Sequence, residues 1–325
     1  MGVAITGDVA QAVAALRSGA LVAIPTETVY GLGASVDHPA AVARVYAVKG
    51  RPADHPLIVH IASSDDLPQW CTGVPPYAGA LAEAYWPGPL TLVLSRSERV
   101  GDFVTGAQET VAIRVPDHPM TLGLLGRLGT GVAAPSANRF GRVSPTAAAH
   151  VAAELGPLLD PGRDLILDGG PTAVGLESTI VDCTGDLPRL LRPGGVTAAQ
   201  IASTTGLALA PPDTRVRAPG TLAAHYAPAA QVRLVTDEGP AAPTAVNPQI
   251  GLIAADHVPT PIGLVRLLAP PDDAAYAAGL YAALREADAM QLREVRVIPP
   301  KGEGLAAAIR DRLHRAAIGS KAGGA

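Results

Sequence analysis

The sequence predicts a two-domain α/β protein: a large N-terminal domain with a twisted mixed sheet and helices, then a smaller, Rossmann-like α/β domain. Three observations support this prediction. The chain has 325 residues, a length typical of two domains. Short apolar runs alternate with turn-rich or helical stretches over its first two-thirds. A Pro-rich stretch without periodicity follows, and strands alternating with helices resume after it.

The composition is that of an ordered protein with a hydrophobic core. Hydrophobic residues make up 48% of the chain and charged residues only 17%, so a sizeable core is available and disorder is not expected. The formal net charge of −4 argues against a protein whose whole surface grips nucleic acid. A local basic cleft stays compatible with this charge, because local clusters determine the field at a site.

The cysteines and the N-terminus indicate a cytoplasmic protein. Cys71 and Cys183 form no C-x-x-C pair, so neither a zinc ribbon nor a disulfide framework is predicted. The N-terminus lacks a basic segment followed by an apolar one, which a secretory signal requires. No uninterrupted apolar run approaches the roughly 18 residues that span a bilayer, so no membrane association is expected.

In the N-terminal domain, the patterns predict one helix and eight strands. Residues 40–49 form the helix, with Pro39 in its first turn and Gly50 at its end. In the strand at 111–115, Val111, Ile113 and Val115 share one face, and Thr110, Ala112 and Arg114 share the other. The remaining strands are predicted at 21–24, 57–61, 90–94, 131–134, 165–167, 179–181 and 189–191.

The domain boundaries follow from the Pro-rich stretch. We expect a first domain at 1–207, a linker at 208–231 and the second domain at 232–325. The linker carries the segment HYAP, at 225–228, whose aromatic polar side chains are unusual for a spacer. In the second domain, the predicted strands are 232–235, 251–254, 263–268 and 295–298, and the predicted helices are 273–290 and 303–318.

Familiar nucleotide and hydrolase motifs are absent. The chain contains no Gly-Lys dipeptide and hence no Walker A loop, and it has no G-x-S-x-G elbow or H-E-x-x-H pair. The segment GTGVAA, at 129–134, matches a dinucleotide loop only loosely and leads into a strand rather than a helix. Nucleotide binding must therefore depend on other residues.

Four polar clusters interrupt the apolar strands: PTETVYGLG at 25–33, KGRPADHPLIVHI at 49–61, AAPSANRFGRVSPT at 133–146, and GLESTI at 175–180 with LLRPG at 190–194. Each lies at the end of a predicted strand or helix, where binding residues gather. A single Arg or His in such a place is more often structural. Together the clusters supply guanidinium, ammonium and hydroxyl groups, a set that suits a triphosphate and a small zwitterion.

The ordered set PTETVYGLG, KGRP, PLIVHI, WPGPLTLVL, VAIRVP, AAPSAN, SPT, ESTI and LLRPG resembles the YrdC-like threonylcarbamoyl-AMP synthases over about 24–194. The HYAP segment and the trailing α/β unit resemble the two-domain version of that family. The resemblance implies a K-x-R…S-x-N signature at Lys49, Arg51, Ser136 and Asn138, with Lys49 and Arg51 as the catalytic cations.

The resemblance also implies the ligands' contacts. Threonine would be held by Thr28, His60, Arg114, Ala134 and Ser178, and ATP by Arg51, His55, Thr110, Ser136, Asn138, Ser144, Arg192 and Tyr226. His55 stands where the family often has Asn, and the segment before HYAP lacks lysines that are often found there. The linker around Tyr226 would close over the site as a lid that excludes water.

The implied reaction joins L-threonine, bicarbonate and ATP into threonylcarbamoyl-AMP and pyrophosphate. Mg²⁺ would arrive with ATP and bridge its phosphates, and no protein side chain is expected to ligate it directly. The product would pass to a tRNA threonylcarbamoyl transferase complex, and weak RNA binding is possible. Two alternatives remain at this point: an RNA-binding module of YrdC-like fold, and an O-carbamoyl adenylating enzyme.

Overall fold

The computed structural model describes residues 2–211, 216–220, 224–235 and 249–322, which form two compact units. The first unit comprises Met1–Phe140, Pro145–Thr172 and Glu177–Thr221, and the second comprises Gly141–Ser144, Ala173–Leu176 and Leu222–Ala325. Within the predicted linker, 212–215 and 221–223 lie outside the described residues. Two short segments from the N-terminal part of the chain therefore pack with the C-terminal unit.

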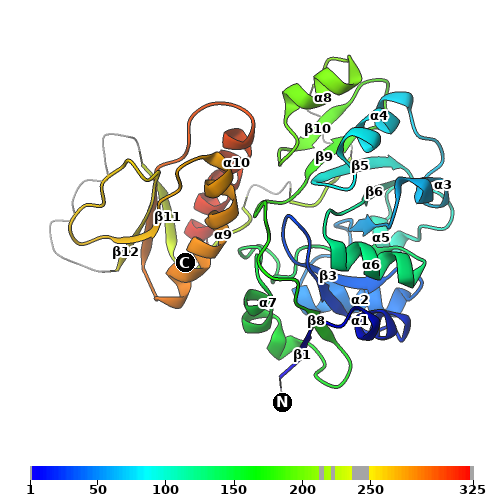
Figure 1. Ribbon diagram of the computed structural model, residues 1–325, viewed down its shortest axis with the longest axis horizontal. Coiled ribbons are helices and arrows are strands. Elements are labelled where there is room, and N and C mark those ends of the chain that lie inside the picture. The colour runs from blue at the N-terminus through cyan, green and yellow to red at the C-terminus, as the bar shows by residue number, and fades with distance from the viewer. Residues whose placement is uncertain (1, 212–215, 221–223, 236–248, 323–325) are drawn as a thin grey trace. The chain divides into compact units, whose positions relative to one another are not determined.

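The first unit is built on a mixed ten-stranded sheet in the order β1-β8-β2-β3-β7-β4-β6-β5-β9-β10 (Figure 1). The sheet is mixed because it contains both parallel pairs, such as β4 with β6, and antiparallel pairs, such as β3 with β7. Its strands are β1 Ala4–Thr6, β2 Val22–Ile24, β3 Gly31–Ser35, β4 Ile58–His60, β5 Leu90–Ser95, β6 Thr110–Arg114, β7 Val132–Ala133, β8 Leu165–Leu167, β9 Thr179–Asp182 and β10 Arg189–Arg192.

Helices and side-chain alternation give this sheet a core on each face. Along β2, Ala23 joins a core with Leu32, whereas Val22 and Ile24 join a separate core with helices α1 and α6. This is the two-residue period of a strand buried on both faces. The helices are α1 Val9–Arg17, α2 Pro39–Lys49, α3 Leu67–Trp70, α4 Pro76–Tyr85, α5 Asp102–Thr105, α6 Pro119–Leu128, α7 Ala148–Glu154 and α8 Ala198–Thr205, with short 3₁₀ turns at Ser64–Asp66 and Gly156–Leu158.

Local signals explain the ends of α2. Pro39 occupies the first helical position, where a missing N–H costs nothing, and Gly50 ends the helix with φ of 62°. Both features confirm the prediction. Because Lys49 is the last helical residue, the ordered end of α2 fixes the start of its side chain.

The second unit has a four-stranded parallel sheet in the order β11-β14-β12-β13, which confirms the predicted Rossmann-like layout. The strands are β11 Gln231–Leu234, β12 Ile250–Ile253, β13 Val265–Leu268 and β14 Glu294–Val297, and the helices are α9 Asp273–Ala289 and α10 Leu305–Ala322. Both helices pack against the sheet and against each other (Figure 1). No helix among the described residues is long and apolar enough to cross a membrane.

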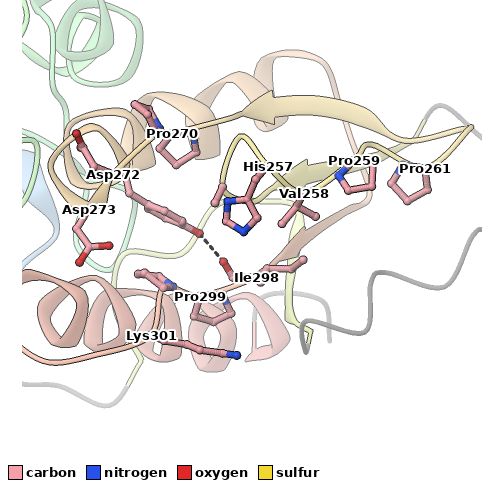
Figure 2. Close-up of a pocket in the computed structure, with 14 residues that line it drawn as sticks. His257, Val258, Pro259, Pro261, Pro270, Asp272, Asp273, Ile298, Pro299 and Lys301 are labelled. Atoms are coloured by element: carbon pink, nitrogen blue, oxygen red, sulfur yellow. Dashed lines mark hydrogen bonds between the residues drawn. The ribbon is translucent and has the colours of Figure 1, made fainter.

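A cavity of about 720 Å³ lies at the carboxyl ends of β12, β13 and β14 in this unit (Figure 2). Its loops are fixed by side chains outside the sheet ladder. The Arg266 guanidinium donates to the carbonyls of Ala254, Ala255 and Val258 at 2.6, 2.6 and 2.9 Å. Tyr276 donates its hydroxyl to the carbonyl of Ile298 at 3.2 Å (Figure 2). These bonds hold Pro-rich loops in place around the cavity.

Candidate active site

One face of the sheet in the first unit carries the predicted amino-acid ligands. On β6, Val111 and Ile113 join the large core, whereas Ala112 lies in a small cluster on the opposite face. Arg114 is two residues after Ala112, so it points to that opposite face. His60 on β4 is the register partner of Arg114. The alternation predicted for β6 is confirmed, and it turns both polar side chains away from the large core.

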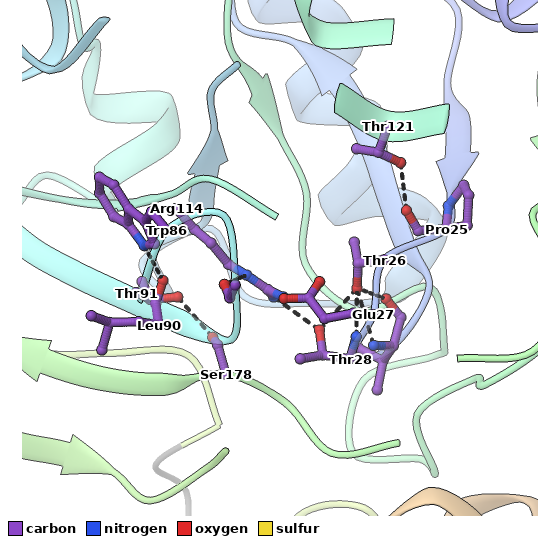
Figure 3. A network of polar contacts seen from close by, with 12 residues as sticks. Pro25, Thr26, Glu27, Thr28, Trp86, Leu90, Thr91, Arg114, Thr121 and Ser178 are labelled. Atoms are coloured by element: carbon purple, nitrogen blue, oxygen red, sulfur yellow. Dashed lines mark hydrogen bonds and ion pairs between the residues drawn. The ribbon is translucent and has the colours of Figure 1, made fainter. Parts of the chain in front are cut away.

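Arg114 lies at the centre of a buried polar network (Figure 3). It is 4% exposed, and its Nη1 donates to Thr28 Oγ1 at 2.9 Å, while its Nε donates to the carbonyl of Gly88 at 3.1 Å. Its Nη2 lies 2.6 Å from Oε1 of Glu27, which is buried too. The network places a fixed guanidinium, a hydroxyl and a carboxylate within contact of one another.

The loop between β2 and β3 positions Thr28 and Glu27. Thr26 Oγ1 accepts hydrogen bonds from the backbone N–H groups of Thr28 and Val29, at 3.2 and 3.1 Å, and lies 2.8 Å from Thr28 Oγ1 (Figure 3). Such local side-chain bonds are typical of a tight turn after a strand. They fix the turn and so aim Glu27 and Thr28 at Arg114.

A second hydroxyl pair lies on the same face of the sheet. Ser178 precedes β9, and its Oγ lies 2.7 Å from Thr91 Oγ1 of the neighbouring strand β5 (Figure 3). Arg192 donates to the Ser178 side chain at 3.1 Å and to its carbonyl at 3.0 Å. The structure therefore joins the predicted threonine ligand Ser178 to the predicted ATP ligand Arg192.

His60 is buried as a neutral imidazole. Burial and, to a smaller extent, the positive charge of Arg114 together lower its pKa to about 3. Its Nδ1 makes no hydrogen bond with any residue that the structure describes. At neutral pH the ring therefore offers a hydrogen-bonding group without a charge.

Lys49 holds the segment that follows β7. Its Nζ donates to the carbonyl of Ser136 at 2.6 Å and also to the carbonyl of Asn138. Burial of the ammonium, with Arg51 nearby, lowers the pKa of Lys49 to about 7. Lys49 thus contacts two other members of the K-x-R…S-x-N signature, and it fixes the backbone of the Ser136–Asn138 segment.

Arg51 and His55 form the next part of this group. Arg51 donates from Nη2 to the carbonyl of Pro56 at 2.9 Å and lies over the ring of Phe140, 5.8 Å from its centroid. His55 contacts the same ring edge-on at 5.5 Å, and partial burial together with Arg51 lowers the pKa of His55. His55 and Arg51 therefore lie close together, against the same aromatic ring.

Backbone hydrogen bonds place the Arg114 network beside the residues of the K-x-R…S-x-N signature. The N–H of Leu32 donates to the carbonyl of Pro135 at 2.8 Å, and the N–H of Ala137 donates to the carbonyl of Tyr30 at 2.7 Å. Ala134 donates its N–H to the carbonyl of Ile58 at 3.0 Å, two residues before His60. The signature segment is therefore adjacent to the turn that carries Glu27 and Thr28.

Three predicted ATP ligands are not shown to lie beside the Arg114 network or the K-x-R…S-x-N residues. Thr110 is at the opposite end of β6 from Arg114, about 13 Å away for four residues of strand. Ser144 and Tyr226 belong to the second unit. There Tyr226 is buried, with φ of 60°; its ring lies under Arg312 at 5.2 Å and stacks on Tyr281 at 5.7 Å. Their roles stay predictions.

Sequence reasoning assigned no role to Glu27 or Thr91, although both lie in the buried network. Glu27 is in the quoted cluster PTETVYGLG and Thr91 in WPGPLTLVL. Their partners, Arg114 and Ser178, are 87 residues away along the chain in each case. A carboxylate between two threonines directly after a strand was the available signal for Glu27.

Comparison with known proteins identifies the family of this chain. A family model described as "Telomere recombination" matches residues 14–194, and one described as "Threonylcarbamoyl-AMP synthase, C-terminal domain" matches residues 196–318. The chain is 40% identical over 340 residues to the threonylcarbamoyl-AMP synthase of Bacillus subtilis, covering 96% of this chain and 93% of the relative. It is 47% identical over 232 residues to that of Pyrococcus abyssi, covering 69% and 66%.

A solved structure is similar over nearly the whole chain. The crystal structure of P. abyssi Sua5 complexed with L-threonine has a TM-score of 0.86 and 35% identity, and the match covers 98% of each chain. Fold and site define a two-domain α/β protein with a buried network of guanidinium, carboxylate and hydroxyl groups in its first unit. The chain belongs to the threonylcarbamoyl-AMP synthase family. The comparisons support this prediction and not the RNA-binding or O-carbamoyl alternatives.

Proposed function

We propose that this chain joins L-threonine, bicarbonate and ATP into threonylcarbamoyl-AMP and releases pyrophosphate. The observation that carries the proposal is the buried Arg114 guanidinium, held against the Thr28 hydroxyl at 2.9 Å beside the K-x-R…S-x-N group. A guanidinium fork binds a carboxylate in a defined orientation. The adjoining cations and hydroxyls suit the phosphates of ATP.

Arg114 would bind the threonine carboxylate, and Thr28, His60, Ala134 and Ser178 would surround the rest of the amino acid. The N-carboxylate made from threonine and bicarbonate then attacks the α-phosphorus of ATP. Negative charge gathers in this transition state, and fixed positive groups stabilise it. Alignment of the reactants can itself supply roughly 7–11 kcal/mol of the rate enhancement.

Lys49 and Arg51 would act on the phosphates in different ways. The Lys49 ammonium already donates to the carbonyls of Ser136 and Asn138, so its first effect is to fix the orientation of that segment. We propose that Arg51, with Arg192 and the Ser136 hydroxyl, contacts ATP directly, and that Asn138 lines the same place. His55, Thr110, Ser144 and Tyr226 complete the proposed ATP contacts.

Mg²⁺ would arrive as part of the ATP complex. The donor set fits a metal held by phosphates, because the nearby carboxylate of Glu27 is already in contact with Arg114. When bound with ATP, such a metal would supply positive charge that offsets the charge developing on the pyrophosphate.

The product is a mixed anhydride that water would destroy, so a downstream enzyme must take it. We propose a tRNA threonylcarbamoyl transferase complex as that recipient, in the cytoplasm, with only weak direct binding of RNA by this chain. The net charge of −4 supports this weak binding.

The decisive assay supplies ¹⁴C-bicarbonate and Mg²⁺-ATP with one amino acid at a time. Threonine should give a labelled adenylate and one pyrophosphate per product. Serine should be the main residual competitor, because one methyl group discriminates by only about 1–3 kcal/mol. Valine, which leaves a hydroxyl partner unmet, should be rejected much more strongly. Turnover of valine equal to that of threonine would contradict the proposal.

A further inference from the structure

Glu27 is a buried carboxylate to which the proposed reaction has so far given no task. It is 7% exposed and lies in the turn between β2 and β3, with its side chain pointing at Arg114 (Figure 3). Oε1 is 2.6 Å from Arg114 Nη2, yet this contact lacks the alignment of a hydrogen bond. Within the described part of the chain, neither oxygen of Glu27 accepts an aligned hydrogen bond.

The geometry differs from that of a pair built only for stability. A structural Arg–carboxylate pair gains most from two parallel hydrogen bonds, which this pair does not make. Buried charges are costly unless their remaining hydrogen-bonding groups are satisfied. Here Nη2 of Arg114 also makes no aligned hydrogen bond to any described residue, while Nε and Nη1 bond Gly88 and Thr28. The Nη2 group of Arg114 and the carboxylate of Glu27, which both lack aligned hydrogen bonds, therefore face one another.

An α-amino acid complements this arrangement. It carries an ammonium group with three donors and a carboxylate on the same carbon. The carboxylate needs a donor such as Nη2 of Arg114, and the ammonium needs acceptors such as the oxygens of Glu27. We propose that Glu27 binds the amino group of the substrate and accepts its proton when the N-carboxylate forms. This inference rests on the proposed function.

The proton step balances in two parts. The substrate ammonium gives one proton to the Glu27 carboxylate, which leaves a neutral amine and a carboxylic acid. The amine lone pair then forms the C–N bond to the carbon of bicarbonate; the C–OH bond breaks, and the departing hydroxide takes the second amine proton as water. Glu27 returns its proton to solvent after the product has left. An ammonium has no lone pair, so the amine cannot attack until this proton has gone.

Wild-type protein tests the binding half by calorimetry without ATP, with L-threonine against 3-hydroxybutyrate, which lacks only the amino group. A charge-assisted contact to Glu27 should make threonine bind about 10- to 100-fold more tightly. Equal affinity of the two ligands for wild type would overturn the proposal. This comparison needs no variant and is therefore independent of any effect on folding.

Glu27→Gln keeps the size of the side chain and removes its charge and its basicity. Threonine should then lose most of its 10- to 100-fold advantage, whereas the affinity for 3-hydroxybutyrate should change little. A merely structural role would weaken both ligands alike, and that result would refute the inference. Glu109→Gln is the matched control, because Glu109 also pairs with an arginine, Arg96 at 3.0 Å, but is exposed.

The proton half is measured as kcat for formation of the labelled adenylate. Glu27→Gln should lower kcat by at least about 100-fold, and Glu27→Asp, which keeps a base, should recover part of that loss. An unchanged kcat in Glu27→Gln would exclude the proton role while wild-type turnover still supports the proposed function. A wild type that forms no adenylate would instead contradict the proposed function itself.

Discussion

Arg114 shows how a single side chain depends on both its strand and its neighbours. Strand alternation turns it away from the large core, and Gly88 and Thr28 then fix its guanidinium in one orientation. A lysine in its place would keep the charge but lose the planar fork. The value of this position for recognition thus lies in geometry as well as in charge.

Arg114→Lys should therefore raise the KM for threonine about 10- to 100-fold, because the oriented two-donor contact to a carboxylate is lost. The KM for ATP should change little. Arg99→Lys is a suitable control, since Arg99 lies over Trp70 at 4.6 Å, away from the Arg114 network. Steady-state kinetics with each substrate varied in turn gives both values, and an unchanged threonine KM would remove Arg114 from the amino-acid site.

His60 predicts a specific pH dependence of stability. Its folded pKa of about 3 is below the value of about 6.5 expected in the unfolded chain. Below pH 6.5 His60 is therefore protonated in the unfolded state but stays neutral in the folded state. The free energy of unfolding then falls as the pH drops from 6.5 towards 3.

His60→Asn cannot take up that proton, so its stability should decline less steeply over the same interval. Urea unfolding at several pH values between 7 and 4 would measure both slopes. Parallel slopes for variant and wild type would show that His60 is not buried as a neutral group.

The face on which Arg114 and His60 lie could be predicted, because alternation is a local property of each strand. The partnership of Glu27 with Arg114 could not, because it joins a turn to a strand far along the chain. The same holds for Ser178 and Thr91, whose contact depends on the pairing of β9 with β5. Local patterns carry no information about such pairings.

At the scale of elements, the patterns did not indicate β1 and β3 of the first unit, and β3 is the more informative of the two. Its sequence GLGAS has little β propensity. It forms because β2 and β7 pair with its two edges. Gly33 permits this close approach, since a Cβ there would lie 2.7 Å from Val132 Cγ1. Tertiary packing therefore decides this element, whereas the strongly periodic strands and α2 followed from their own residues.

Gly194 is the glycine whose replacement should damage the site most directly. A Cβ at this position would lie 2.4 Å from the backbone N of Thr179 and 2.6 Å from the carbonyl of Glu177, on either side of Ser178. Gly194→Ala must therefore displace that backbone, and we expect a loss of about 1–3 kcal/mol in the free energy of unfolding. Activity should fall as well, because Ser178 moves.

Gly126→Ala is the matched control. Gly126 lies in α6 with no other heavy atom near its would-be Cβ, so alanine should stabilise the helix by about 0.5–1 kcal/mol. Thermal melts and urea unfolding of both variants compare the two effects. A Gly194→Ala protein as stable and active as wild type would contradict the packing described around Ser178.

At the scale of the whole molecule, the class of both domains could be predicted from periodicity. The order of the ten strands could not, because neighbours such as β3, β7 and β4 are distant in sequence.

The predicted linker at 208–231 and its lid role remain predictions. A variant from which only residues 219–228 are deleted tests the lid role: activity at the wild-type level would exclude a lid.

Threonine-dependent exchange of ³²P-pyrophosphate into ATP measures whether this chain activates threonine as a carbamoyl-adenylate. Exchange reports the reversible attack on the α-phosphorus without any downstream partner. Exchange should be rapid only when threonine and bicarbonate are both present with Mg²⁺-ATP, and it should fall sharply in Arg114→Lys. Exchange that proceeds without bicarbonate, or no exchange with all the substrates present, would rule out this activation of threonine.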